Sequence, residues 1–207
     1  MGGGNNLGID RSSGEFLLVL NPDTVLSKNA ISSLLSYIRA NPRIGLVGPK
    51  LVYPDGRLQA SCSRFPTFFV PILRRTFLGD YFKKIRDRFA MTDFKHDAIR
   101  DVDWLMGSCL LFRRRIICPD ASLFTPRFDE RYFMYFEDID LCRQFWSRGL
   151  PVQYYPEVVV THDHRRASAA HPWYFAIFLS RLAWSHIASW LKYFIKWGFR
   201  VGSRRSL

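Results

Sequence analysis

Apolar and polar positions along the chain follow two periods, and their order predicts an α/β domain. Phe16–Leu20 is a continuous apolar run, which is typical of a strand covered on both faces of a sheet. Ser27–Ala40 carries apolar residues at helical spacing, and Ser27 is the expected N-cap of this helix. Ile44–Tyr53 indicates a second buried strand, which the turn sequence Pro54-Asp55-Gly56 follows. A strand, a helix and a strand in this order predict helices layered on a sheet.

The other segments are predicted from the same two patterns. Met1–Asn6 is glycine-rich but lacks the Gly-Lys-Ser/Thr ending of a phosphate loop, so we expect a flexible start. Leu7–Gly14 is expected to be the end of a helix that Gly14 stops. The basic stretch Arg64–Arg100 is expected to form either solvated helical faces or a mobile lid. After it, the patterns predict a strand over Val102–Arg113, a helix within Phe128–Arg148 that Gly149 ends, and a last strand over Leu150–Thr161.

Pro172–Arg200 has the pattern of an amphipathic helix. Most of its circumference is aromatic or aliphatic, and no acidic residue follows Asp163, whereas eight Lys or Arg residues do. A helix of this kind is typical of an anionic membrane interface. The alternative is a helix packed on the protein's own sheet. At about 3.6 residues per turn, the basic and small polar residues fall within one arc of about 100°, and we call Arg181, Ser185, Ser189, Lys192, Lys196 and Arg200 the basic arc.

Composition limits the partners that such a chain can have. With 207 residues and 48% hydrophobic content, the chain can form one substantial globular core. Its net charge of +12 indicates an acidic partner, which could be nucleic acid, anionic lipid or a phosphorylated ligand. No helix-turn-helix, RNP or zinc pattern accompanies the charge, so we expect no nucleic-acid partner. The four cysteines lack metal-like spacing, and we expect reduced cytosolic thiols, no signal peptide and no membrane-spanning helix.

Three groups of acidic or histidine residues lie at the ends of predicted elements. Asp23 follows the first strand, Glu137-Asp138-Ile139-Asp140 opens a helix, and His162-Asp163-His164 follows the last strand. Each has an ordinary explanation: a turn acid, carboxylates at a helix N-terminus, and strand-end residues. If the three groups converge, they suit a nucleotide-diphosphate reaction, in which a divalent cation binds carboxylates and phosphate oxygens and another carboxylate is the general base.

The order of several sequence blocks resembles family 2 glycosyltransferases, and within them the bacterial rhamnosyltransferase-like branch. The resemblance spans roughly Gly2 to Ser168 and implies a GT-A fold, which is an α/β fold for nucleotide-diphospho-sugar transfer. The block around the acidic motif is the most specific of the five. They are GGGNNLGIDRSSGEFLLVLNPDT, LVYPDGRLQ, VDWLMGSCLLFRR, FDERYFMYFEDIDLCRQFWSRG and VVVTHDHRRAS.

The resemblance implies a metal and donor site with Mg²⁺ or Mn²⁺ as cofactor. The sequence NPDT stands where the family has its DxD-type motif, with Asn21 in place of the first acid and Asp23 as the expected metal ligand. Asn21 is then expected to contact the donor. His162 matches a histidine that reaches the metal or the diphosphate in related enzymes.

The resemblance also implies the catalytic and substrate-binding residues. Asp138 matches the general base of an inverting transfer, and Glu137 is expected to position the acceptor or the base. Trp104, Gly107 and Ser108 match the segment that lines the sugar and acceptor pocket. Two further residues of the acidic block, Asp140 and Arg143, are expected to support the loop and the helix.

The implied activity is transfer of a sugar from a nucleotide-diphospho-sugar donor, with dTDP-rhamnose expected, to a cell-surface polysaccharide or a lipid-linked acceptor with inversion. We expect a cytoplasmic protein that lies peripherally on the inner face of the cell membrane. The initial V-V-V-x-N-Y-N strand of the family is not found, so we expect residues 1–168 to form a truncated, incomplete GT-A domain and residues 169–207 to form a helical tail. The alternative is an inactive remnant that binds membrane through that tail.

Overall fold

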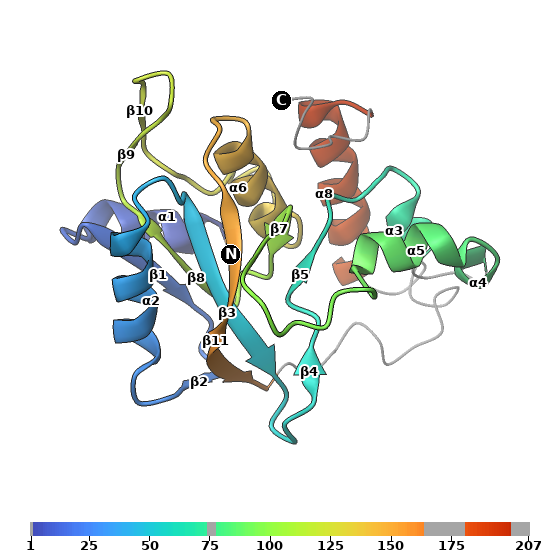
Figure 1. The fold of residues 1–207 in the computed structure, drawn as a ribbon. Helices are drawn as coiled ribbons and strands as arrows, with labels where there is room; N and C mark the ends of the chain where they lie inside the picture. Colours follow the sequence, from blue (N-terminus) through green and yellow to red (C-terminus); the bar gives the residue numbers. More distant parts are fainter. Residues whose placement is uncertain (1, 74–77, 164–180, 200–207) are drawn as a thin grey trace.

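The centre of the molecule is a mixed seven-stranded sheet (Figure 1). The computed structural model describes residues 2–73, 78–163 and 181–199. Five strands lie in the order β1-β8-β3-β11-β2, while β4 pairs with β3 and β6 pairs with β11. The pair β3–β11 is parallel, and the other pairs of this sheet are antiparallel. The strands are β1 (Phe16–Leu20), β2 (Thr24–Leu26), β3 (Leu46–Val52), β4 (Leu58–Gln59), β6 (Arg100–Asp101), β8 (Cys109–Arg113) and β11 (Val152–His162).

Helices and two short ribbons surround this sheet. The ribbons are β5 (Cys62–Ser63) with β7 (Trp104–Leu105), and β9 (Ile116–Ile117) with β10 (Leu123–Phe124). The helices are α1 (Gly2–Arg11), α2 (Ala30–Ala40), α3 (Val70–Leu73), α4 (Leu78–Tyr81), α5 (Lys83–Ala90), α6 (Glu137–Trp146) and α8 (Arg181–Trp197). No helix in the described ranges is both long and apolar enough to cross a membrane.

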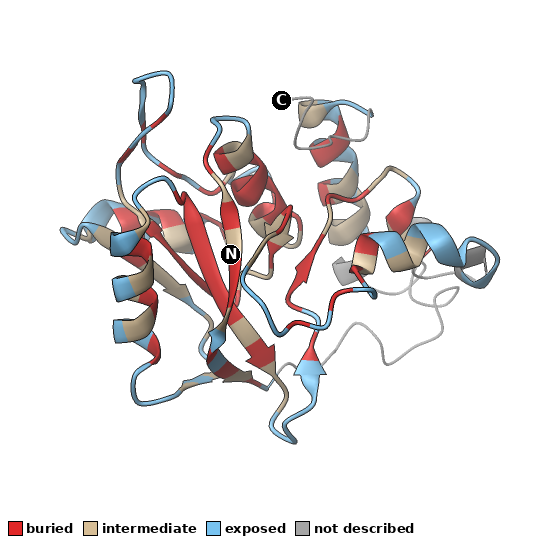
Figure 2. Ribbon diagram, in the orientation of Figure 1, coloured by how far each residue is buried: buried red, intermediate tan, exposed pale blue. Residues whose placement is uncertain are grey.

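The core has two main layers, one on each side of the sheet. On one side, Leu34 and Ile38 of α2 pack in a cluster with Val47 and Val160 of the central strands. On the other side, Leu141 and Phe145 of α6 belong to a separate cluster with Leu46 and Phe112 of the central strands. Figure 2 shows buried residues concentrated in the central strands and on the inner sides of the helices. The predicted α/β architecture is therefore confirmed.

Several predicted elements and turns are confirmed by the structure. The apolar runs form β1, β3 and β11 within one residue or two of their predicted bounds. Gly56 has a positive φ of 80° in the predicted turn between β3 and β4. Gly149 has a φ of 69° just after α6, where glycine was expected to end the helix. The four cysteines are free and buried, as expected for reduced thiols.

The start of the chain differs from its prediction. Met1–Asn6 was expected to be flexible, yet α1 begins at Gly2 and runs to Arg11, before Gly14. Asn6 explains the difference, because its side-chain amide donates to the carbonyl of Phe128 at 2.8 Å and accepts from the Phe128 N–H at 2.9 Å. A contact across 122 residues thus overrides the poor helix propensity of the glycines.

Two other predictions were wrong in detail. Helix α2 begins at Ala30 rather than after Ser27, because the Ser27 carbonyl accepts the Ala30 N–H in a preceding turn. The strand predicted over Val102–Arg113 is divided into β7 and β8, because Trp104 and Leu105 pair with β5 in a separate ribbon, which the bond from the Met106 N–H to the Ser61 carbonyl extends. The helix predicted over Pro172–Arg200 is described from Arg181 to Trp197, and its beginning and the division at residue 168 lie outside the described residues.

Candidate active site

Asp23 and His162 meet at one end of the sheet. Asp23 lies in the turn between β1 and β2, and His162 is the last residue of β11. Because Thr24 pairs with His162 in the β2–β11 register, the two side chains are brought together. His162 Nε2 lies 3.3 Å from Asp23 Oδ1. The imidazole is 1% exposed, whereas the carboxylate is open to solvent.

The loop between β7 and β8 connects this pair to the rest of the sequence-predicted site. The N–H of Asn21 donates to the carbonyl of Ser108 at 3.0 Å. The Ser108 hydroxyl lies 3.3 Å from His162 Nδ1. The break in the predicted strand therefore places Ser108 between the turn that carries Asp23 and the end of β11.

The same loop contacts Asp138 at the beginning of α6. Asp138 Oδ2 accepts the N–H of Gly107 at 3.1 Å, and its Oδ1 accepts the N–H of Ile139 at 2.9 Å. A Cβ atom at Gly107 would lie 3.4 Å from the Cβ of Asp138, so the backbone approaches closely here. Consecutive residues of one loop thus contact the candidate base and the candidate metal ligand His162.

The two carboxyl groups at the start of α6 hold protons more strongly than usual. Burial raises the pKa of Asp138, although the N–H groups of Gly107 and Ile139 oppose this effect. Burial, together with the charge of Asp138, raises the pKa of Glu137 to about 7. Glu137 Oε2 is buried and has no hydrogen-bond partner in the described part of the chain. A carboxylate with a raised pKa is a stronger proton acceptor, which suits a general base.

Trp104 takes a different place from the other predicted site residues. Its indole Nε1 donates to the carbonyl of Arg64 at 2.8 Å, and its ring packs near that of Phe89. Trp104 contacts both the core cluster of α6 and the aromatic cluster beside α8. The described polar contacts do not connect it to Asp23, His162 or Asp138. The structure therefore joins Asn21, Ser108 and Gly107 to these residues, but not Trp104.

Gln59 was not predicted as a site residue. It ends β4 and is 2% exposed, and its Oε1 lies 2.7 Å from His162 Nδ1. The sequence block LVYPDGRLQ places Gln59 just after the turn at Gly56, which is the signal that could have indicated it. Its approach to His162 depends on the pairing of β3 with both β4 and β11, and local patterns do not predict this pairing.

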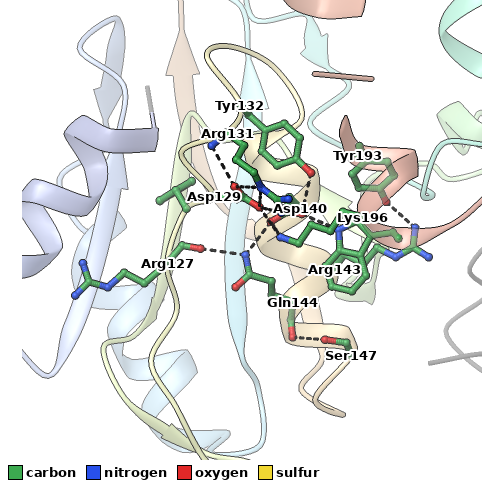
Figure 3. A network of polar contacts seen from close by, with 12 residues as sticks. Arg127, Asp129, Arg131, Tyr132, Asp140, Arg143, Gln144, Ser147, Tyr193 and Lys196 are labelled. Carbon is green, nitrogen blue, oxygen red and sulfur yellow. Dashed lines mark hydrogen bonds and ion pairs between the residues drawn. The ribbon is translucent and has the colours of Figure 1, made fainter. Parts of the chain in front are cut away.

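The C-terminal helix α8 contacts both the loop Asp129–Phe136, which precedes α6, and the first turn of α6 (Figure 3). Lys196 Nζ lies 2.8 Å from Asp140 Oδ2 and 2.8 Å from Asp129 Oδ2. Trp197 Nε1 donates to Asp140 Oδ1 at 2.6 Å, and Tyr132 donates to the same oxygen at 3.2 Å. Asp140 is fully buried. It thus serves the structural role that the sequence predicted for it.

Other residues of α8 contact the backbone of this loop. The Ser189 hydroxyl donates to the carbonyl of Met134 at 2.8 Å, and Lys192 Nζ donates to the carbonyl of Arg131 at 2.7 Å. Tyr135 and Phe136, the residues directly before Glu137, both have a φ of 67°. Left-handed backbone at two such bulky residues is costly and must be held by its surroundings. The contacts with α8 provide such support.

These contacts change the picture of the basic arc. The helix was expected to lie in an anionic membrane interface or, alternatively, to pack on the protein's own sheet. In the structure, Ser189, Lys192 and Lys196 bind the loop and α6 of the same chain. The helix also presents a separate exposed apolar face. We define this face by three residues, Trp184, Leu191 and Ile195, of which Trp184 is 60% and Ile195 75% exposed.

The Asp23–His162 pair can be compared with the needs of a divalent cation. A carboxylate oxygen and an imidazole nitrogen are both ligands for such ions, and they lie side by side here. A group of three or more His, Cys, Asp or Glu residues that could hold a metal is not found within the described ranges. Mg²⁺ commonly binds one or two carboxylates and completes its shell with phosphate oxygens and water. The residues therefore fit a cation that is shared with a phosphorylated ligand.

Comparison with known proteins decides the family. The model of the "Glycosyltransferase like family 2" matches residues 4–184. The chain belongs to glycosyltransferase family 2. The mixed sheet with helices on both sides agrees with the GT-A-type architecture expected for this family, followed by a C-terminal helix. The match includes every sequence-predicted site residue of this glycosyltransferase chain.

Several relatives have names that describe sugar transfer. An N-acetylglucosaminyl-diphospho-decaprenol L-rhamnosyltransferase of Mycobacterium tuberculosis is 32% identical over 76% of this chain and 50% of its own length. The rhamnosyltransferase WbbL of Escherichia coli is 25% identical over 72% of this chain and 52% of its own length. The O-antigen biosynthesis protein RfbC of Myxococcus xanthus is 29% identical over 80% of this chain and 12% of its own length. The chain thus spans about half the length of the rhamnosyltransferases that it matches.

Proposed function

We propose that this chain carries the catalytic centre of a rhamnosyltransferase that uses dTDP-rhamnose and inverts the anomeric configuration. The acceptor is a lipid-linked or cell-surface saccharide. The names of the relatives from Mycobacterium tuberculosis and Escherichia coli support the sugar, and the first of them supports a lipid-linked acceptor. The donor nucleotide and the inversion follow from the resemblance to the rhamnosyltransferase-like branch.

One observation carries this proposal. The loop Met106–Ser108 contacts Asp138 through Gly107 and His162 through Ser108, and His162 lies beside Asp23. A candidate base and two candidate metal ligands therefore occupy one end of the sheet, although they come from distant parts of the sequence. An arrangement of this kind serves the attack of a hydroxyl group on a carbon that carries a diphosphate leaving group.

Each residue then has a chemical role. Asp138 takes the proton from the acceptor hydroxyl while the acceptor oxygen bonds to the anomeric carbon and the bond to the diphosphate breaks. Attack from the side opposite the leaving group gives inversion. Asp23 and His162 would hold Mg²⁺ or Mn²⁺, and the cation would neutralise charge that develops on the diphosphate. Asn21 and the loop residues Gly107 and Ser108 contact the donor or acceptor, and Glu137 orients the acceptor.

The test compares Asp138→Asn with the unaltered chain. We expect calorimetric binding of dTDP-rhamnose with Mn²⁺ in both, because the asparagine oxygen still accepts the Gly107 N–H. Transfer to a saccharide acceptor should fall by about 10²-fold or more, which is the usual contribution of a general base. Asp120→Asn is the matched control, since Asp120 lies in an exposed turn with Ser122.

Three outcomes would contradict parts of this proposal. Unchanged transfer by Asp138→Asn would exclude Asp138 as the base. A product of retained anomeric configuration, seen by NMR, would exclude inversion. A folded chain that binds neither donor nor Mn²⁺ would favour an inactive chain instead.

We further propose that the protein lies peripherally on the inner, anionic face of the cell membrane. Its exposed apolar face, Trp184, Leu191 and Ile195, is the part of α8 that the loop contacts leave uncovered. The acid-free sequence after Asp163 supplies positive charge nearby in sequence. The exposed apolar face would enter the interface while the opposite side of α8 keeps its contacts with the loop.

Vesicle flotation tests the membrane proposal. Binding to phosphatidylglycerol-containing vesicles should weaken in a Leu191→Ser/Ile195→Ser variant, whose thermal stability should change little because both residues are exposed. Ser32→Ala on α2 is the surface control. Equal flotation of the double variant and the control would exclude this face as the contact.

A further inference from the structure

Gln59 and His162 form a buried pair whose geometry defines the state of the histidine. Gln59 Oε1 lies 2.7 Å from His162 Nδ1, and the two side chains are 2% and 1% exposed. An amide oxygen can only accept a hydrogen bond. With Oε1 as the atom that faces the ring, this contact is a hydrogen bond only when Nδ1 carries a proton.

The other ring nitrogen is then the one that faces Asp23. A neutral imidazole carries one N–H, so a proton on Nδ1 leaves a lone pair on Nε2. Nε2 lies 3.3 Å from Asp23 Oδ1, so in the neutral ring two electron-rich atoms face each other at this distance, and a cation between or beside them removes the repulsion. The tautomer that Gln59 selects is therefore the one that binds a metal ion.

We infer that Gln59 is a positioning residue that holds His162 in the Nδ1–H tautomer and so prepares Nε2 and Asp23 for a divalent cation. This inference rests on the proposed function for the identity of the cation, but the tautomer itself does not depend on it. Gln59 acts through His162 and has no direct bond to the metal.

The rest of the Gln59 side chain agrees with this role. Its Nε2 is buried and has no hydrogen-bond partner in the described part of the chain. An amide kept only for folding would normally have its nitrogen as well as its oxygen bonded. The hydroxyl of Ser108, at 3.3 Å from Nδ1, is the longer contact and can accept the same proton. Gln59 is thus the main acceptor and Ser108 the secondary one.

NMR of the full ¹⁵N-labelled chain tests the inference without any metal or substrate. Long-range ¹H–¹⁵N correlations distinguish a protonated ring nitrogen from a bare one. We expect His162 to be protonated on Nδ1 and bare on Nε2 in the unaltered chain. In Gln59→Leu, a large part of the population should move to Nε2–H, because Asp23 is then the better acceptor.

Calorimetric titration with Mn²⁺ supplies the second measurement. The Mn²⁺ dissociation constant of Gln59→Leu should rise by about 10- to 100-fold, which is typical for loss of a hydrogen-bond partner of a metal ligand. Gln59→Glu keeps an accepting oxygen and should keep both the tautomer and most of the affinity. Gln153→Leu is the control, because Gln153 is a part-buried glutamine of the same sheet whose side chain is bonded to Tyr37 and Asp101.

The outcomes separate this inference from the proposed function. An unaltered chain whose His162 carries a proton on Nε2, alone or together with one on Nδ1, would overturn the inference. A folded Gln59→Leu variant with unchanged tautomer and Mn²⁺ affinity would overturn it as well. If Gln59→Leu does not fold, Gln59→Asn, whose side chain is one methylene too short, decides by the same criteria. A chain that shows the Nδ1–H tautomer but binds no Mn²⁺ would contradict the proposed metal and leave the role of Gln59 established.

Discussion

Lys196 Nζ lies 2.8 Å from the Oδ2 atom of Asp140, a residue 56 positions earlier in the chain and fully buried. Asp140 is in the first turn of α6, two residues after Asp138. The C-terminal helix therefore supplies the positive charge that a buried carboxylate at the candidate base needs. α8 therefore helps to hold the candidate site and is more than a surface tail.

Lys196→Met should lower the free energy of unfolding by about 3 kcal/mol, because removing one partner of a buried ion pair leaves an uncompensated charge. Urea denaturation measures this change. Lys192→Met is the matched control on the same helix, since Lys192 donates to a carbonyl at an exposed position, and its loss should change stability by less than about 1 kcal/mol. Equal losses in both variants would show that the Asp140 contact has no special weight.

Gly45→Ala should destabilise the protein by about 1–3 kcal/mol through overpacking. A Cβ atom at Gly45 would lie 2.5 Å from Cδ1 of Phe145 and 2.9 Å from the Cβ of Leu150, so α6 would have to move away from β3. Gly8→Ala is the control, because nothing lies within 4 Å of its added Cβ and alanine should stabilise α1 by about 0.5–1 kcal/mol. Thermal unfolding of both variants decides, and a stable Gly45→Ala would contradict the close packing.

Glu137 should make stability depend on pH. Its pKa is raised from 4.5 to about 7 in the folded chain, so its stabilising contribution is complete below about pH 4.5 and is lost as the pH rises through about 7. The free energy of unfolding should fall by up to about 1.4 kcal/mol per pH unit within this window. Glu137→Gln should flatten the decline, whereas Glu15→Gln, at an exposed position, should keep it. Parallel profiles for all three proteins would exclude a buried, protonated Glu137.

The elements that local patterns predicted well are those whose burial is periodic. β1, β3 and β11 are apolar runs in the sheet, and α6 has a glycine at its end. The sequence offered the convergence of Asp23, Asp138 and His162 only as a condition, and the structure brings them together through the loop Met106–Ser108. The roles of these residues in transfer and metal binding stay predictions.

The features that the sequence did not indicate depend on contacts between distant residues. The glycines of α1 gave no sign of the bonds between Asn6 and Phe128. The basic arc on α8 has the same pattern whether it meets lipid or protein, and the contact with Asp140 distinguishes the two. Gln59 becomes recognisable only when β3 has brought β4 and β11 to the same place.

The loop Met106–Ser108 has a consequence for how this site can change. Gly107 contacts Asp138, the proposed base, and Ser108 contacts His162, the proposed metal ligand, so two proposed tasks share one short piece of backbone. A shift of that backbone toward a new acceptor would also displace His162, the proposed metal ligand. Substitutions at its two ends should therefore combine non-additively. Residues around the loop should therefore tolerate substitutions that alter substrate specificity better than residues within the loop.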